Sequence, residues 1–169
     1  MIIVLNGPLG IGKSTLAEAL AEQIGSCVML DGDHLVALNP PPDDEAAYLH
    51  ATVALLYVHH RSHGYRHFVV NHIWRAPEQL ADLHGCLREV DPQVDLRCFL
   101  LTLPADENMR RIERRRHARA IDEEEFERLT VADERQVLYA HPAGSIGEPF
   151  DVSAPPNDLV TRLMSRLSL

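Results

Sequence analysis

The feature that most constrains this chain is a glycine-rich segment close to its amino terminus. Residues 7–14 read Gly-Pro-Leu-Gly-Ile-Gly-Lys-Ser, which is a complete G-x-x-x-x-G-K-[ST] pattern. An apolar run at 2–5 precedes it, and an amphipathic stretch at 14–24 follows it. A strand, a glycine-rich turn and a helix in this order form a loop that binds phosphate groups. We therefore predict a nucleotide-binding domain that begins with this unit.

Each part of the pattern has a chemical task in binding a nucleoside triphosphate. Glycines let the backbone approach phosphate oxygens closely, and successive N–H groups at the start of the helix form a positively polarised seat for an anion. Lys13 is expected to reach the β- and γ-phosphates, and the Ser14 hydroxyl is expected to coordinate Mg²⁺. The predicted nucleotide-binding residues of this loop are Gly7, Leu9, Gly10, Ile11, Gly12, Lys13, Ser14 and Thr15.

The rest of the chain alternates between strand-like and helix-like segments. Apolar runs predict strands at 2–6, 27–31, 67–72, 96–103 and 149–153. Helical periodicity and end signals predict helices at 13–24, 44–62, 76–90, 105–119, 122–138 and 156–167. Strands that are apolar on both faces are typical of a parallel sheet covered by helices. The expected fold is α/β, a single three-layer α/β/α domain over residues 1–169 with a five-stranded parallel sheet.

Charge and cysteine content limit where this chain acts and what it binds. Its 25 acidic and 16 basic residues give a net charge of −9, which argues against a nucleic-acid partner. No apolar run approaches the length of a membrane span, and no secretion signal precedes the first strand. Cys27, Cys86 and Cys98 show no C-x-x-C pair, so we expect reduced thiols in a cytoplasmic protein. Either a monomer or a homodimer fits the sequence.

Residues that directly follow strands are candidates for the site, because ligands bind beyond the carboxyl ends of the strands in such sheets. Asp31 and Asp33 follow the second predicted strand and are separated by Gly32. One such carboxylate can accept a proton from a substrate hydroxyl, while the other orients Mg²⁺. We predict Asp33 as the base and Asp31 as the metal-side partner, with the reverse assignment left open. His34 is a predicted substrate contact beside them.

A second polar group follows the third predicted strand. Many phosphate-loop enzymes place an aspartate here to bind Mg²⁺, but this chain has Asn71. Either Asp31 or Asp33 then serves the metal, or water does. Arg75 is expected to pair with a group of the acceptor, and Trp74 to stack on it. The alternative is a helix-start arginine and a core tryptophan.

The one concentration of basic residues lies on the helix predicted at 105–119. Arginines four positions apart share a helix face, as Arg111 and Arg115 do, and as Arg115 and Arg119 do. A mobile helix of this kind, here a lid at about 114–124, can close over a nucleotide and neutralise charge on the migrating phosphoryl group. The alternative is a solvated basic helix that pairs with nearby acidic residues or binds RNA.

These features together resemble the small phosphate-loop kinases of the AAA-type phosphate-loop NTPase superfamily. That group includes gluconate kinase, shikimate kinase, adenylylsulfate kinase and chloramphenicol phosphotransferase. The resemblance rests on the phosphate loop, on Leu30-Asp31-Gly32-Asp33 and on the Arg111-x-x-x-Arg115 helix. It implies the phosphate-loop nucleoside triphosphate hydrolase fold with a helical lid, ATP as donor, and phosphoryl transfer as the reaction.

The resemblance also implies roles for particular residues. In this group an aspartate after the second strand commonly contacts the acceptor hydroxyl, which supports Asp33 as the base. Arg111 matches an arginine that packs against adenine, Arg115 matches a lid arginine, and Asp151-Val152-Ser153 looks like the segment that borders the base. The chain departs from the group at Asn71, where the usual acid is missing.

The functional hypothesis is an ATP- and Mg²⁺-dependent kinase that phosphorylates a hydroxyl group of a small molecule. Lys13, Asp33 and Arg115 are the predicted catalytic residues, and Asn71 and Arg119 are further predicted substrate contacts. A sugar acid, an antibiotic and a nucleoside all fit as the acceptor. Two alternatives stay open, a nucleoside or nucleotide kinase and a non-catalytic ATP-binding switch.

Overall fold

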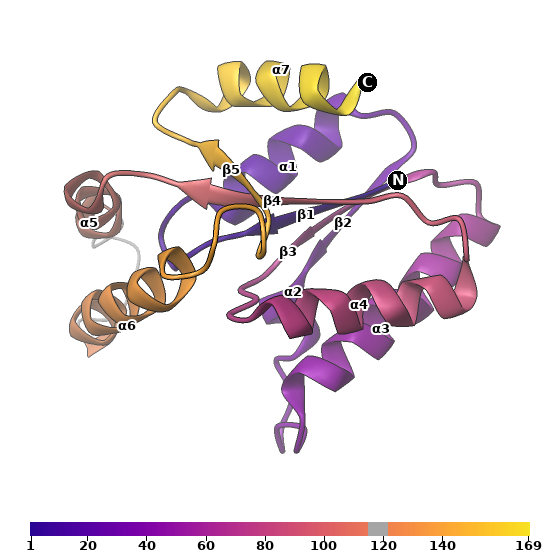
Figure 1. Cartoon of the computed structure of the whole chain (residues 1–169), viewed down its shortest axis with the longest axis horizontal. Coiled ribbons are helices and arrows are strands. Elements are labelled where there is room, and N and C mark those ends of the chain that lie inside the picture. The colour runs from indigo at the N-terminus through magenta and orange to yellow at the C-terminus, as the bar shows by residue number, and fades with distance from the viewer. Residues whose placement is uncertain (115–121) are drawn as a thin grey trace.

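The computed structural model describes residues 1–114 and 122–169 of the chain (Figure 1). Its centre is a five-stranded sheet in which neighbouring strands run parallel. The strands, in the order in which they lie side by side, are β2 (Cys27–Asp31), β3 (His67–Asn71), β1 (Ile2–Asn6), β4 (Leu96–Thr102) and β5 (Glu148–Asp151). The predicted α/β fold with a parallel sheet is therefore confirmed.

Helices occur where the sequence predicts them, with one short addition. They are α1 (Lys13–Gln23), α2 (Gly32–Leu35), α3 (Glu45–Ser62), α4 (Pro77–Val90), α5 (Ala105–Arg114), α6 (Asp122–Tyr139) and α7 (Pro156–Leu167). α2 was not predicted; it begins directly after β2, where the Asp31 carboxylate accepts a hydrogen bond from the Asp33 N–H at 3.0 Å. Within 1–114 and 122–169, no helix is both long and apolar enough to cross a membrane.

The helices cover both faces of the sheet, with α1 and α7 on one face and α3 and α4 on the other (Figure 1). The central strand β1 is apolar at successive positions because helices cover both of its faces. Ile3 and Leu5 pack on the side of α1 and α7, whereas Ile2 and Val4 pack on the side of α3 and α4. Burial of each such side chain stabilises the folded state by about 2 kcal/mol. The site is thus built on a strand that is buried on both faces.

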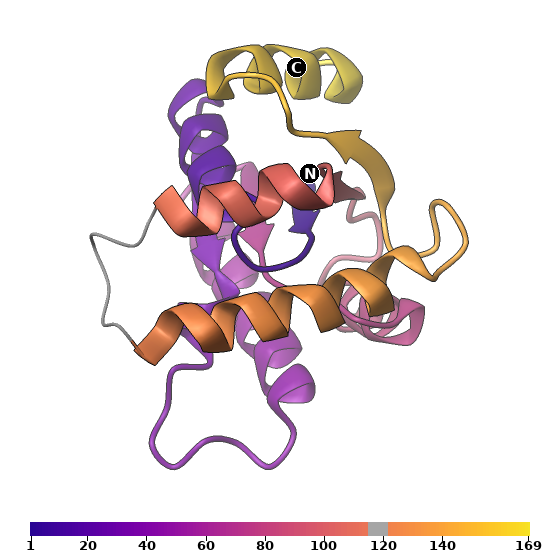
Figure 2. The same ribbon diagram turned by 90° about the vertical axis from the view of Figure 1, so that its left-hand side faces the viewer.

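The parallel register brings the carboxyl ends of the strands together at one edge of the sheet. Asn71 at the end of β3 pairs with Asp31 on one side and with Leu5 on the other. β3 ends at Asn71, one residue earlier than predicted, because β2 turns into α2 after Asp31 and leaves His72 without a strand partner there. α5 and α6 lie side by side beyond this edge (Figures 1 and 2).

Candidate active site

The glycine-rich pattern forms a tight turn between β1 and α1. Gly10 and Gly12 have φ angles of 73° and 105°, in a backbone region that residues with a side chain rarely adopt. Gly12 is the N-cap residue that directly precedes α1, and no acidic residue lies in the first turn of that helix. The N–H groups and the dipole at this helix start therefore favour an anion.

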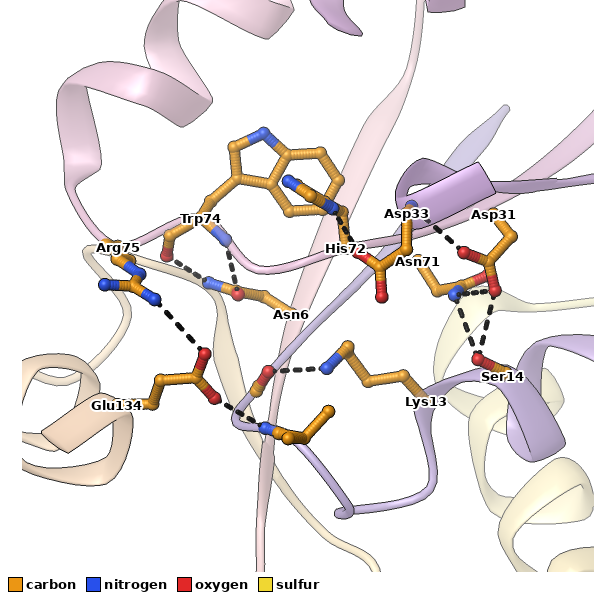
Figure 3. A network of polar contacts seen from close by, with 12 residues as sticks. Asn6, Lys13, Ser14, Asp31, Asp33, Asn71, His72, Trp74, Arg75 and Glu134 are labelled. Atoms are coloured by element: carbon orange, nitrogen blue, oxygen red, sulfur yellow. Dashed lines mark hydrogen bonds and ion pairs between the residues drawn. The ribbon is translucent and has the colours of Figure 1, made fainter. Parts of the chain in front are cut away.

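The Lys13 side chain folds back over this turn. Its Nζ donates hydrogen bonds to the carbonyl oxygens of Gly7 at 2.9 Å and Pro8 at 3.2 Å (Figure 3). The ammonium group therefore lies beside the loop, at a place where phosphate oxygens can replace the carbonyl oxygens as acceptors.

Ser14, Asp31 and Asn71 form one cluster where α1 begins and β2 and β3 end (Figure 3). Oδ2 of Asp31 accepts from the Ser14 hydroxyl at 3.1 Å and from Nδ2 of Asn71 at 2.9 Å. Oδ1 of Asn71 is buried and has no hydrogen-bond partner among the described residues. Hydroxyl, carboxylate and amide oxygens are ligands that Mg²⁺ accepts, directly or through water. The cluster fits Mg²⁺ at Ser14 and Asp31, with Asn71 orienting the carboxylate.

Asp33 lies on α2 and pairs with His72, a residue to which the sequence analysis assigned no role. Nδ1 of His72 lies 2.8 Å from Oδ1 of Asp33 (Figure 3). The pKa of Asp33 is below its ordinary value, mainly because of the hydrogen bond from His72; burial opposes this, and the charges of His72, Lys13 and His34 add to the lowering. Asp33 is therefore ionised at neutral pH and able to accept a proton. His34, next to it, is exposed.

The residue before the phosphate loop connects that loop to the segment after β3. Nδ2 of Asn6 donates to the carbonyl oxygens of Trp74 at 2.9 Å and Ile146 at 3.1 Å, and its Oδ1 accepts from the Trp74 N–H at 2.9 Å. The indole N–H of Trp74 donates to Nε2 of His50 at 3.1 Å. Trp74 is 1% exposed, so the core tryptophan is the interpretation that the structure supports.

Glu134 of α6 is a site residue that sequence reasoning missed. Its side chain is 6% exposed, its Oε2 accepts the Leu9 N–H at 2.7 Å, and its Oε1 lies 3.2 Å from Nη2 of Arg75. Arg75 is therefore already paired with an acid of its own chain. A sequence signal did exist, because Glu134 occupies the same buried helix face as Val131 and Leu138, where an apolar residue is expected.

A cavity of about 230 Å³ lies between the phosphate loop, α5 and the segment after β5. The guanidinium of Arg111 donates to the carbonyl oxygens of Ile11 at 3.0 Å and Val152 at 2.7 Å, which fixes it at the cavity wall. Other lining residues include Thr15, Leu16, Arg114, Pro156 and Leu159. Aliphatic walls with a fixed guanidinium suit a flat aromatic group.

Asp151 is not among the residues that line this cavity. Its carboxylate accepts hydrogen bonds from the hydroxyl and, at 2.8 Å, the N–H of Ser153, and these bonds hold its pKa below the ordinary value. The neighbouring Val152 and Ala154 form the wall instead. The predicted segment therefore borders the cavity, although Asp151 itself turns toward Ser153.

A second cavity, of about 210 Å³, lies between α3, the segment after β3 and the start of α4. His50, His72, Trp74, Arg75, Glu45 and Gln79 take part in its lining. Burial lowers the pKa of His50, so this imidazole is neutral at neutral pH. Because His72 both lines the cavity and contacts Asp33, this is the candidate site for an acceptor.

The predicted lid residues are only partly described. Arg111 and Arg114 lie on α5 beside the first cavity. Arg115 and Arg119 lie outside the described residues, and so does the part of the predicted lid at 115–121. Their proposed roles at the phosphates stay predictions.

Comparison with known proteins gives one family match and several structures of similar fold. The family model of an AAA domain matches residues 2–140. No match was found among curated protein sequences. The unliganded sugar kinase of Janibacter sp. HTCC2649 is 20% identical, with a TM-score of 0.69 over 99% of this chain and 94% of that chain.

Two further solved structures extend this likeness. A gluconokinase from Sinorhizobium meliloti 1021 is 20% identical, with a TM-score of 0.66 over 98% of this chain and 94% of that chain. The tunicamycin resistance protein of Deinococcus radiodurans is 15% identical, with a TM-score of 0.65 over 99% of this chain and 95% of that chain. The family match spans the phosphate loop, both carboxylates after β2 and Glu134. The chain therefore belongs to the AAA domain family and has the fold of the small phosphate-loop kinases.

Proposed function

We propose that this protein is an ATP-dependent kinase that transfers the γ-phosphoryl group to a hydroxyl group of a small molecule. One observation carries the proposal: Lys13 of the phosphate loop and the carboxylate of Asp33 lie at the same carboxyl edge of the sheet (Figure 3). A loop that binds phosphate and a base that accepts a hydroxyl proton are the groups that this reaction needs.

The donor nucleotide is proposed to occupy the phosphate loop and the 230 Å³ cavity. Its adenine would pack against Arg111, and its phosphates would lie on the N–H groups at the start of α1, with Lys13 exchanging loop carbonyls for phosphate oxygens. This assigns nucleotide binding to the start of α1 and to α5.

Mg²⁺ is proposed to bind at Ser14 and Asp31, where its charge would offset the negative charge of the phosphates. No group of three or more His, Cys, Asp or Glu side chains in the described parts of the chain is placed to hold a metal ion. The nucleotide would therefore supply much of the remaining oxygen coordination.

The acceptor is proposed to lie in the second cavity with one hydroxyl at Asp33. Asp33 takes the hydroxyl proton as the acceptor oxygen bonds to the γ-phosphorus and the bond from that phosphorus to ADP breaks. Lys13, with Arg115 and Arg119 from the proposed lid, would stabilise the charge on the transferring group. Asn71 would hold Asp31 in place. Arg75, which lines this cavity and pairs with Glu134, would contact the acceptor, and so would the exposed His34 next to Asp33.

An ADP-release assay with ATP and Mg²⁺ tests this proposal. D-gluconate, shikimate, tunicamycin and a set of nucleosides represent the acceptor classes suggested by the resemblance and by the similar structures. At least one hydroxylated compound should raise the rate above that with water alone, and ³¹P NMR should show a phosphate ester. Asp33→Asn should lose the stimulated rate and keep ATP binding. ADP release that no compound of a wide hydroxyl panel stimulates would contradict the kinase proposal and favour a switch.

A further inference from the structure

The imidazole of His72 is oriented by its bond to Asp33. The His72 side chain is 11% exposed, and its Nδ1 lies 2.8 Å from Oδ1 of Asp33. An ionised carboxylate only accepts hydrogen bonds, so Nδ1 of His72 must carry the hydrogen. This contact is made by Oδ1, and we expect Oδ2 to be the oxygen that receives a proton from an acceptor.

Gly32 provides the space that this orientation requires. A Cβ atom at position 32 would lie 2.6 Å from Cβ, 2.7 Å from Cγ and 2.8 Å from Nδ1 of His72. Any side chain there would displace the imidazole, because these distances are far below van der Waals contact. Glycine at a helical position costs up to about 1 kcal/mol relative to alanine, so helix stability does not explain its presence in α2.

The other side of the imidazole is also confined. The ring of His72 meets the ring of Trp74 edge to face, with centroids 5.4 Å apart and an interplanar angle of 83°. Trp74 is itself fixed by the bond from its indole N–H to His50 and by the bonds of its backbone to Asn6. Gly32 on one side and the Trp74 ring on the other therefore flank the imidazole that contacts Asp33.

We propose that His72 is a positioning residue for the catalytic carboxylate, holding Oδ1 of Asp33 so that Oδ2 faces the acceptor hydroxyl. This inference rests on the proposed function, because it assumes that Asp33 is the base. It also explains why a glycine separates Asp31 from Asp33. Gly32 leaves room for the imidazole of His72, and that imidazole orients the carboxylate of Asp33.

The first test needs no acceptor. Long-range ¹H–¹⁵N NMR at one fixed pH reports which ring nitrogen of His72 carries the hydrogen. The wild-type protein should show the Nδ1–H tautomer, and Asp33→Ala should lose that preference. Gly32→Ala should change the His72 signals, whereas Gly85→Ala, a helical glycine with open space around its Cα, should leave them unchanged. A wild-type Nε2–H tautomer, or a tautomer insensitive to Asp33→Ala, overturns the inference.

The second test uses water as the phosphoryl acceptor and measures ADP formation from ATP. His72→Leu removes the donor and should lower kcat about tenfold with an unchanged KM for ATP, which is the loss expected for one hydrogen bond to a charged group. His72→Asn places an amide nitrogen near the position of Nδ1 and should stay within about threefold of wild type. Gly32→Ala should behave as His72→Leu does, and Gly85→Ala as wild type.

The two proposals fail in different ways. If wild type forms ADP and both His72→Leu and Gly32→Ala match its kcat, the positioning role is wrong and the kinase proposal stands. If wild type binds ATP but forms no ADP with water or any hydroxyl compound, the kinase proposal fails. The tautomer measurement then still decides whether His72 holds Asp33.

Discussion

Lys13 is held by two carbonyl oxygens of its own loop, and phosphate oxygens are stronger acceptors for the same N–H groups because they carry charge. The side chain leaves the first residue of α1 and returns to the loop. It therefore adds charge to the phosphate site without supporting the apolar core. A substitution of Lys13 should therefore reduce activity without destabilising the fold.

Replacing this lysine should remove activity and leave the protein folded. Lys13→Ala is expected to lower the rate of ADP formation at least about hundredfold, because a preorganised charge at the transferring phosphoryl group is lost. Thermal melting followed by circular dichroism should show nearly the wild-type Tm. Arg97→Ala removes one positive charge from an exposed ion pair with Asp95 and serves as the control, with a normal rate expected. A wild-type rate for Lys13→Ala would refute the assignment of the loop.

Glu134 and Arg75 form an ion pair in which only the acid is buried, and the two partners should differ in their effect on stability. Glu134→Ala leaves the Leu9 N–H without its acceptor and should lower the free energy of unfolding by about 2 kcal/mol. Arg75→Ala removes a half-exposed partner and should cost less than about 1 kcal/mol. Urea unfolding of both variants measures this difference, and equal losses would show that the bond to Leu9 contributes nothing.

The sequence identified the polar residues of the site more reliably than their partners. Asp31 and Asn71 end strands β2 and β3, and Asp33 follows β2, so their place at one edge was predictable from the parallel fold. The bond between His72 and Asp33 joins residues 39 positions apart and depends on the relative position of β2 and β3. Such a contact has no local signature, and neither does the bond between Glu134 and Leu9.

At the scale of elements, the ends of helices are marked by chemistry that the sequence displays. α4 begins with Pro77, and α3 is followed by Gly64 with a φ angle of 90°. These signals explain why most predicted bounds lie within one or two residues of the observed ones. The short helix α2 was missed because a single turn has too few residues to show a helical period, and only its capping acid, Asp31, marks it.

The capping acid of α3 gives a prediction with a matched control. The Asp44 side chain accepts a hydrogen bond from the Ala47 N–H at 2.9 Å, whereas the neighbouring Asp43 is exposed and is not the capping residue. Asp44→Ala should lower the free energy of unfolding by about 1 kcal/mol. Asp43→Ala should change it by less than about 0.5 kcal/mol. Urea unfolding measures both, and equal effects would show that the cap does not stabilise α3.

Across the whole molecule, the first cavity borders the phosphate loop and the second does not, and each is lined by segments from distant parts of the chain. A single sequence indicates the alternation of strands and helices, but the strand order β2-β3-β1-β4-β5 depends on how the layers pack. The second cavity combines α3, the segment after β3 and α4, so its shape was not predictable from any one motif.

Closure over bound nucleotide should be visible by hydrogen exchange. The segment 33–45 carries Leu38, a large apolar side chain that is 43% exposed and has surface to bury on closing. With a non-hydrolysable ATP analogue and Mg²⁺, amides at 33–45 and at the proposed lid 114–124 should exchange more slowly. Amides at 86–95, which border neither cavity, should not change. Unaltered exchange of both segments with the analogue bound would contradict closure.

Asn6 joins two parts of the candidate active site, the phosphate loop and the segment after β3. It directly precedes the phosphate loop, and its buried side chain makes three hydrogen bonds to the backbones of Trp74 and Ile146. In the proposed reaction, these three bonds would set the distance between the donor on the phosphate loop and the acceptor in the second cavity. Substitutions on α3 and α4 would then alter which acceptor fits the second cavity without changing that distance.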